Sequence, residues 1–244
     1  MQCLRCQAEN EADHRYCKTC GILLQPLEVM GDLEQAQLLE RQGRMAEAAQ
    51  EYRRALDLNP QNPAARYGYG LMLYHGGQLI EAVSEFQQAA SLNPSFADAH
   101  FMLSVCYYRR CMFEESVAAA RRVLDIDPTY LPGLYRCGRA LFHMGKLEES
   151  IEALETLVRQ QPSNIIAYYH LGIAYERKRL WDRAIQAFSR VVAENPRDAS
   201  SHYHLGVCYR RRMLNDLAVG AFMKVLELDP EDAAAAEQLQ HLQK

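Results

Sequence analysis

Large apolar residues recur along this chain at helical spacing, and the pattern returns every 34 residues. One helical stripe within the stretch 165–198 carries Ile185, Phe188, Val191 and Val192. An apolar column that keeps the longer step reads Tyr52, Phe86, Ala120, Leu154, Phe188 and Phe222. Prolines keep the same step at Pro60, Pro94, Pro128, Pro162, Pro196 and Pro230. A fixed period of this length is typical of stacked units, each too small to bury its own apolar face.

Small residues form two further columns with the same step. One reads Ala48, Ala82, Ser116, Ser150, Ala184 and Ala218. The other reads Ala36, Gly70, Ser104, Gly138, Gly172 and Gly206. Small side chains let helix axes approach, so the columns predict two helices that cross closely within each unit. An Asn-Pro, Asp-Pro or Gln-Pro pair closes each unit, because proline disfavours helix in the residue before it.

The turn between the two helices carries glycine in only three units. These glycines are Gly43, Gly77 and Gly145, and the equivalent positions elsewhere hold Cys111, Arg179 and Met213. The latter three turns are expected to form without the conformational freedom of glycine.

The residues of the later units resemble a known family. The pattern Tyr168-x-x-Leu171-Gly172-x-x-Tyr175, followed by Ala184, Phe188 and Pro196, is similar to a tetratricopeptide repeat. The pattern returns as His202-x-x-Leu205-Gly206-x-x-Tyr209, and the resemblance covers roughly residues 29–232. It implies a binding scaffold, because this fold carries many different partners.

Four of the eight cysteines crowd into the first 20 residues as two Cys-x-x-Cys pairs, Cys3, Cys6, Cys17 and Cys20. Two intervening residues let both thiolates of a pair face one metal, and four thiolates form the tetrahedral shell that suits Zn²⁺. The segment resembles the small zinc-ribbon domains of many bacterial proteins, although Gln7 stands where a glycine often follows the second cysteine. Four sulfur ligands leave no open position, so the predicted zinc is structural; iron is the alternative metal.

We therefore predict an all-α fold, a right-handed α-solenoid of six tetratricopeptide hairpins preceded by a four-cysteine zinc ribbon over 1–24. The hairpins within 29–232 are expected over 29–62, 63–96, 97–130, 131–164, 165–198 and 199–232. A C-terminal cap helix is expected over 233–244, where Ala235, Leu239 and Leu242 share one face.

Composition narrows the function further. The formal net charge of −4 argues against a general grip on nucleic acid. The chain has no apolar run long enough to span a membrane and no secretory leader, so we expect a cytoplasmic protein. The remaining cysteines and the histidines fall singly into repeat columns, without a Ser/His/Asp arrangement or a phosphate-binding loop. These observations predict that the protein is not an enzyme.

The resemblance implies that the first helix of each unit lines a concave groove. The groove residues we expect to contact a partner are Tyr67, Leu71, Tyr74, Phe101, Val105, Tyr108, Tyr135, Arg136, Arg139, Phe142, Tyr169, His170, Ile173, Arg177, Tyr203, His204 and Arg210. Its middle is aromatic and aliphatic, and its C-terminal half is basic. The asparagines of the clamp used by chaperone-binding relatives are replaced by Leu71, Val105 and Ile173, which disfavours that class of partner.

We accordingly predict an adaptor that holds a protein or peptide segment, with apolar anchors and acidic groups, in this groove. One alternative is a scaffold that assembles with further copies of itself. The other is a regulatory protein associated with nucleic acid through the zinc ribbon and stripes such as Tyr209-Arg210-Arg211-Arg212.

Overall fold

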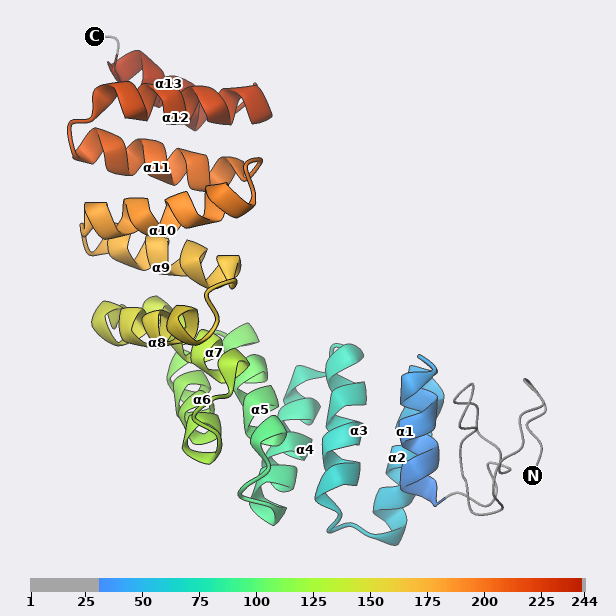
Figure 1. The fold of residues 1–244 in the computed structure, drawn as a ribbon. Coiled ribbons are helices and arrows are strands. Elements are labelled where there is room, and N and C mark those ends of the chain that lie inside the picture. The colour runs from blue at the N-terminus through green and yellow to red at the C-terminus, as the bar shows by residue number, and fades with distance from the viewer. Residues whose placement is uncertain (1–30, 243–244) are drawn as a thin grey trace, which may run out of the picture. The chain divides into compact units, whose positions relative to one another are not determined.

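The computed structural model describes residues 31–242, which form α-helices and no strand (Figure 1). The helices within this range are α1 (Asp32–Arg41), α2 (Met45–Leu58), α3 (Pro63–His75), α4 (Leu79–Leu92), α5 (Ala97–Arg109), α6 (Phe113–Ile126), α7 (Leu131–His143), α8 (Leu147–Gln160), α9 (Ile165–Arg177), α10 (Trp181–Glu194), α11 (Ala199–Arg211), α12 (Asn215–Leu228) and α13 (Ala233–Leu242). The predicted zinc ribbon, with its four cysteines, lies outside the described residues.

The chain divides into two compact units, Met1–Ala99 and His100–Lys244. In the described part of the first unit, α1 packs on α2, α2 on α3, and α3 on α4. In the second unit the helices from α6 onwards pack successively in the same way, ending with α13 on α12. Each unit is thus a series of helical hairpins whose neighbours share a core.

The helix ends follow from the residues around each proline. α2 ends at Leu58, directly before Asn59-Pro60, and α4 ends at Leu92, before Asn93-Pro94. A polar residue two positions after the proline then starts the next helix in several units. The Asn62 side-chain oxygen accepts from the backbone N–H groups of Ala64 (3.0 Å) and Ala65 (3.2 Å). Asn164, Asp198 and Asp232 accept from backbone N–H groups in the same manner.

The turns inside the hairpins share one backbone conformation. Gly43, Gly77 and Gly145 have φ of 74°, 79° and 76°. Cys111, Arg179 and Met213 have φ of 58°, 61° and 62°, so they adopt the left-handed conformation without being glycine. In every case the next residue donates its N–H to a carbonyl five residues earlier, as in Met112 N–H to Tyr107 O at 2.9 Å. This Schellman geometry satisfies the end of the first helix of each hairpin.

The two small-residue columns mark the points where paired helices cross. A Cβ added to Gly172 would lie 2.7 Å from Phe188 Cε1, and one added to Gly138 would lie 2.7 Å from Leu154 Cγ. The Ser104 and Ser116 hydroxyls each donate to the backbone carbonyl of the other residue, both at 2.9 Å. The close crossing that the columns predict is therefore confirmed.

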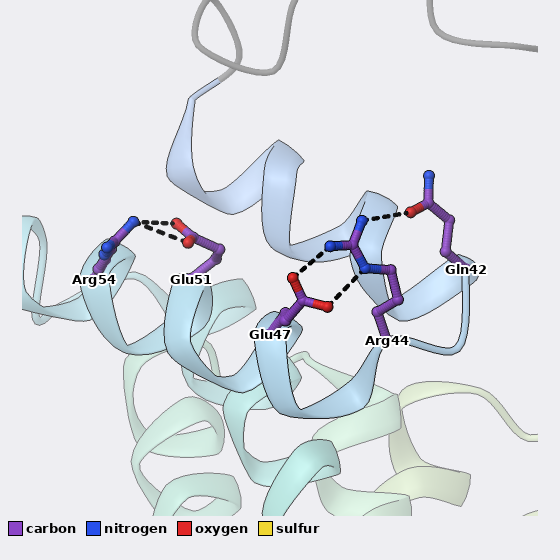
Figure 2. A network of polar contacts seen from close by, with 5 residues as sticks. All are labelled: Gln42, Arg44, Glu47, Glu51 and Arg54. Carbon is purple, nitrogen blue, oxygen red and sulfur yellow. Dashed lines mark hydrogen bonds and ion pairs between the residues drawn. The ribbon is translucent and has the colours of Figure 1, made fainter.

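Surface polar contacts add little to this architecture. In the first unit, Arg44 donates to Glu47 at 2.7 Å and to Gln42 at 3.5 Å, and separately Arg54 donates to Glu51 at 2.9 Å (Figure 2). Both pairs join residues three apart, and both arginines are exposed. Such solvent-exposed pairs contribute little to stability, because water and salt screen them. The fold depends instead on the buried columns, which include Tyr52, Phe86, Phe188 and Phe222.

Candidate functional site

A cavity of about 280 Å³ opens among three helices of the second unit. Arg139, Phe142 and His143 line it from α7, Leu154 from α8, and Tyr169, His170 and Ile173 from α9. We call this space the α7–α9 cavity. It brings together five of the predicted groove residues, which are Arg139, Phe142, Tyr169, His170 and Ile173.

Comparison with the next hairpin shows why space is left here. In that hairpin the Phe188 ring stacks on His204, with ring centroids 5.1 Å apart and planes 9° apart. The equivalent residues in the cavity are Leu154 and His170, one repeat earlier. Because leucine lacks the aromatic ring of Phe188, the corresponding space beside His170 stays open. The cavity therefore opens where leucine takes the place that phenylalanine fills in the next hairpin.

Cationic side chains cover the aromatic rings around the cavity. The Arg139 guanidinium lies 4.8 Å from the Tyr108 ring centroid and 5.5 Å from that of Tyr135. Arg136 lies 4.9 Å from the Tyr108 centroid, and Arg177 lies 5.0 Å from that of Phe142. These cation–π contacts hold Arg139 and Arg177 in place without neutralising their charge.

The two arginines that flank the cavity lack acidic partners. Within residues 31–242, neither Arg139 nor Arg177 has a carboxylate at ion-pair distance. The nearby Glu176 is engaged elsewhere, since its Oε2 lies 2.7 Å from His204 Nδ1. The rim therefore carries positive charge that a bound anion could balance.

The histidines do not add to this charge. Burial, together with the positive charges of Arg139 and His143, lowers the pKa of His170 to about 4. Burial, Arg139 and Arg177 likewise lower the pKa of His143 below its ordinary value. At neutral pH both rings are uncharged, so each can donate or accept a hydrogen bond.

Apart from Arg177, which lies over Phe142, the other predicted groove residues do not line this cavity. In the first unit, Tyr67 and Leu71 line a separate cavity of about 490 Å³ together with Glu40 and Tyr52, while the Tyr74 ring lies against His75. In the second unit, Phe101 lies against Tyr130 and Tyr203 against Phe222. Val105 is only 7% exposed and belongs to the core. Arg210 is partly exposed near the end of α11.

Two lining residues were not among the expected contacts. His143 is one of the basic residues that end the first helix of each hairpin, which are Arg41, His75, Arg109, His143, Arg177 and Arg211. Their favourable interaction with the negative end of the helix dipole is a sufficient explanation for their presence. In the structure it also stacks on Phe113, with ring centroids 4.8 Å apart. Leu154 lies on the second helix of its hairpin, which the family pattern does not assign to the groove. Phe86, Phe188 and Phe222 hold its place in other hairpins, but Ala120 departs from phenylalanine as well, so the column alone does not single out Leu154.

Three of the four cysteines in residues 31–242 are packed in the core, whereas Cys111 is exposed in a turn. Cys106, Cys137 and Cys208 are buried. Burial raises the pKa of Cys106 to about 11 and that of Cys208 to about 12. These side chains are therefore protonated thiols that pack as small apolar groups. Between residues 31 and 242, no helix has the length and apolarity that crossing a bilayer requires.

Comparisons with known proteins agree with this architecture. The solved structure of YrrB, described as a TPR protein with an unusual peptide-binding site, superposes with a TM-score of 0.73 at 19% identity, covering 79% of this chain and 99% of YrrB. For pilF of Pseudomonas aeruginosa the TM-score is 0.68 at 15% identity, covering 87% of this chain and 95% of pilF. For MamA of Desulfovibrio magneticus RS-1 the TM-score is 0.66 at 22% identity, covering 70% of this chain and 97% of the MamA chain.

A search of curated protein sequences found no match. The family model of the tetratricopeptide repeat matches residues 33–90, 77–130, 135–199 and 177–233, which together span most of the chain. The matches include helical hairpins of both compact units, together with the columns of small and apolar residues that shape them. The chain therefore belongs to the tetratricopeptide repeat family.

Proposed function

We propose that this protein is an adaptor that holds a segment of another protein at the α7–α9 cavity. The observation that carries the proposal is the pair Arg139 and Arg177, which flank an apolar cavity without a carboxylate partner in the described region. Tetratricopeptide folds are typical of protein–protein interaction scaffolds, and YrrB, which shares the fold, is described as having a peptide-binding site.

The cavity sets the size of the apolar anchor. A volume of about 280 Å³ lies below the range of roughly 300–1,000 Å³ that is usual for small-molecule sites. It suits one large side chain, such as leucine or phenylalanine, from an extended or helical segment. Phe142, Leu154 and Ile173 supply the apolar wall against which this side chain would pack.

The rim sets the charge of the segment. A carboxylate beside the anchor can accept two parallel hydrogen bonds from a guanidinium, a geometry that lysine cannot reproduce. Arg139 and Arg177 are already oriented by aromatic rings, so little side-chain freedom is lost on binding. The neutral His170 ring can add a further hydrogen bond. The preferred segment therefore combines an apolar anchor with neighbouring aspartate or glutamate.

Selection from a random peptide display library on the full chain tests both features. We expect enriched sequences to place acidic residues within a few positions of a large apolar residue. Arg139→Glu should weaken the selected peptides by roughly 10- to 100-fold, since it removes a charged hydrogen bond and adds repulsion. Arg122→Glu is the matched control, because Arg122 lies on α6, is exposed and does not line the cavity.

Leu154→Phe tests the cavity without changing any charge. The opposing Gly138 leaves the same room that Gly172 leaves for Phe188, so the variant should fold normally. It should fill the space beside His170 and abolish binding of the apolar anchor. Selection of peptides without acidic residues, or unchanged affinity in both Arg139→Glu and Leu154→Phe, would overturn the proposal. Enrichment of nucleic acid from a mixed pool would favour the nucleic-acid alternative instead.

A further inference from the structure

The last hairpin exposes apolar side chains from its turn onto its second helix, α12. Met213 is 78% exposed, Leu217 is 52% exposed and Met223 is 53% exposed. Leu214 beside them is also exposed, and Gly220 lies between Leu217 and Met223. We call the surface formed by Met213, Leu214, Leu217, Gly220 and Met223 the α12 face.

The other hairpins show that this composition is specific to the last one. The position of Leu217 is occupied one to five repeats earlier by Arg183, Glu149, Glu115, Glu81 and Glu47. The position of Met223 is occupied by Ser189, Glu155, Arg121, Gln87 and Arg53. Both columns are polar in all five earlier hairpins, so neither apolar residue follows from the repeat. Large apolar residues exposed together at one hairpin are typical of interaction surfaces.

The terminal helix does not use this surface. α13 packs through Ala235, Leu239 and Leu242 into a cluster formed by Ala218, Phe222 and Val225. Those three residues of α12 lie on a different face from Leu217, Gly220 and Met223. The α12 face therefore stays exposed although the hairpin already carries its final helix.

Gly220 is a second, independent sign of contact. It lies in the interior of α12, where glycine destabilises a helix relative to alanine. No atom lies within 4 Å of where its Cβ would be, so nothing described in the protein requires the absence of a side chain. Glycine at this position would, however, let another helix approach the backbone closely.

We propose that the α12 face pairs with the same face of a second copy of this protein, with the two α12 helices antiparallel and crossing at Gly220. Residues at equal distances before and after Gly220 then meet across a two-fold axis. Leu217 of each copy meets Met223 of the other, and Asp216 of each copy meets Lys224 of the other. Two apolar contacts and two opposite-charge contacts form at once.

The charges around the face support this occupant. Asp216 is exposed and has no ion-pair partner within the described range, while Lys224 pairs only with Glu227 of its own helix, at 2.7 Å. An unrelated partner would carry a positive charge opposite Asp216 and a negative charge opposite Lys224 only by chance. A second copy does so automatically, because it brings the same helix in the reverse direction.

Mixed charge variants test this arrangement directly. The mass of the full chain is measured by analytical ultracentrifugation from about 1 to about 200 µM, a range that covers weak dimers. The wild-type protein should dimerise, and Asp216→Lys and Lys224→Asp should each weaken the dimer roughly tenfold or more, because each creates two like-charge contacts. An equimolar mixture of the two variants should recover the dimer, since both contacts are then attractive.

Two further variants control for folding and for location. Gly220→Ala should raise the melting temperature and yet weaken the dimer. A folding defect would instead lower the melting temperature and the dimer affinity together. Ile166→Glu, at an exposed position on α9, should leave the dimer unchanged. A monomer throughout the range, or a dimer that the mixture does not restore, would overturn the proposal. In the latter case residues 1–30 of the chain or another protein would be the occupant to test. Arg139→Glu should not change the mass, so this result is distinguishable from a failure of the proposed adaptor function.

Discussion

Replacing the two strained turn residues Cys111 and Arg179 by glycine should stabilise the second unit. Their φ values of 58° and 61° place them in the left-handed region, which costs an L-residue about 1–2 kcal/mol relative to glycine. Glycine loses about 0.5–1 kcal/mol of this advantage because its unfolded chain is more flexible. The net gain is about 0.5–1 kcal/mol at each turn, or about 1–2 kcal/mol for both. For a unit of this size, the melting temperature should rise by roughly 2–8 °C.

Thermal unfolding followed by circular dichroism, with reducing agent present, measures this change. Gly145→Ala is the reverse control: it forces alanine into φ of 76° at the equivalent turn and should lower stability by about 1 kcal/mol. Met213 is left unchanged in this experiment, because its exposed side chain belongs to the α12 face. Glycine variants that melt at or below the wild-type temperature, together with a Gly145→Ala variant of unchanged stability, would refute the reasoning.

Two further predictions concern acid stability and metal content. The pKa of His170 is about 4 in the folded protein and close to its ordinary value of 6.5 when unfolded, so stability is fully present above pH 6.5 and falls as the pH drops toward 4. The loss, discounted for the partial exposure of the ring, is about 1–2 kcal/mol, and His170→Gln should flatten the pH dependence of urea unfolding. Elemental analysis should find about one zinc per purified chain, and Cys17→Ser should abolish it; a coloured, iron-containing protein would contradict zinc.

The helical hairpins could be predicted because the sequence repeats the same pattern of helix-forming and helix-ending residues several times. A single Asn-Pro pair is weak evidence of a helix end, but its return at a fixed step leaves one consistent interpretation. The small columns specified the helix crossings, and the Gly172–Phe188 and Ser104–Ser116 contacts lie at those crossings. The expectation that the turns at Cys111 and Arg179 form without glycine is also confirmed, but the left-handed conformation that these residues adopt is a finding of the structure.

The candidate site was predictable only in part. Family pattern assigns the first helix of each hairpin to the groove, and this assignment includes Arg139, Tyr169 and His170, which do line the α7–α9 cavity. The repeat pattern alone could not show that Val105 is buried or that Glu176 forms a hydrogen bond with His204. Those outcomes depend on side-chain packing between neighbouring hairpins, which the period of the sequence does not encode.

Both proposed surfaces arise where one hairpin departs from its column. Leu154 stands where the next hairpin has Phe188, and the α7–α9 cavity opens between it and His170, whereas the Phe188 ring stacks on His204. Leu217 replaces a charged residue and exposes the α12 face, whereas Arg183 at the equivalent place reaches Glu155. In a repeat protein the neighbouring hairpins have the same backbone and the same packing requirements, so they act as internal controls for each position. A residue that breaks its column without a packing reason is therefore selected by something outside the hairpin, and substitution back to the column residue is the most direct test of what that is.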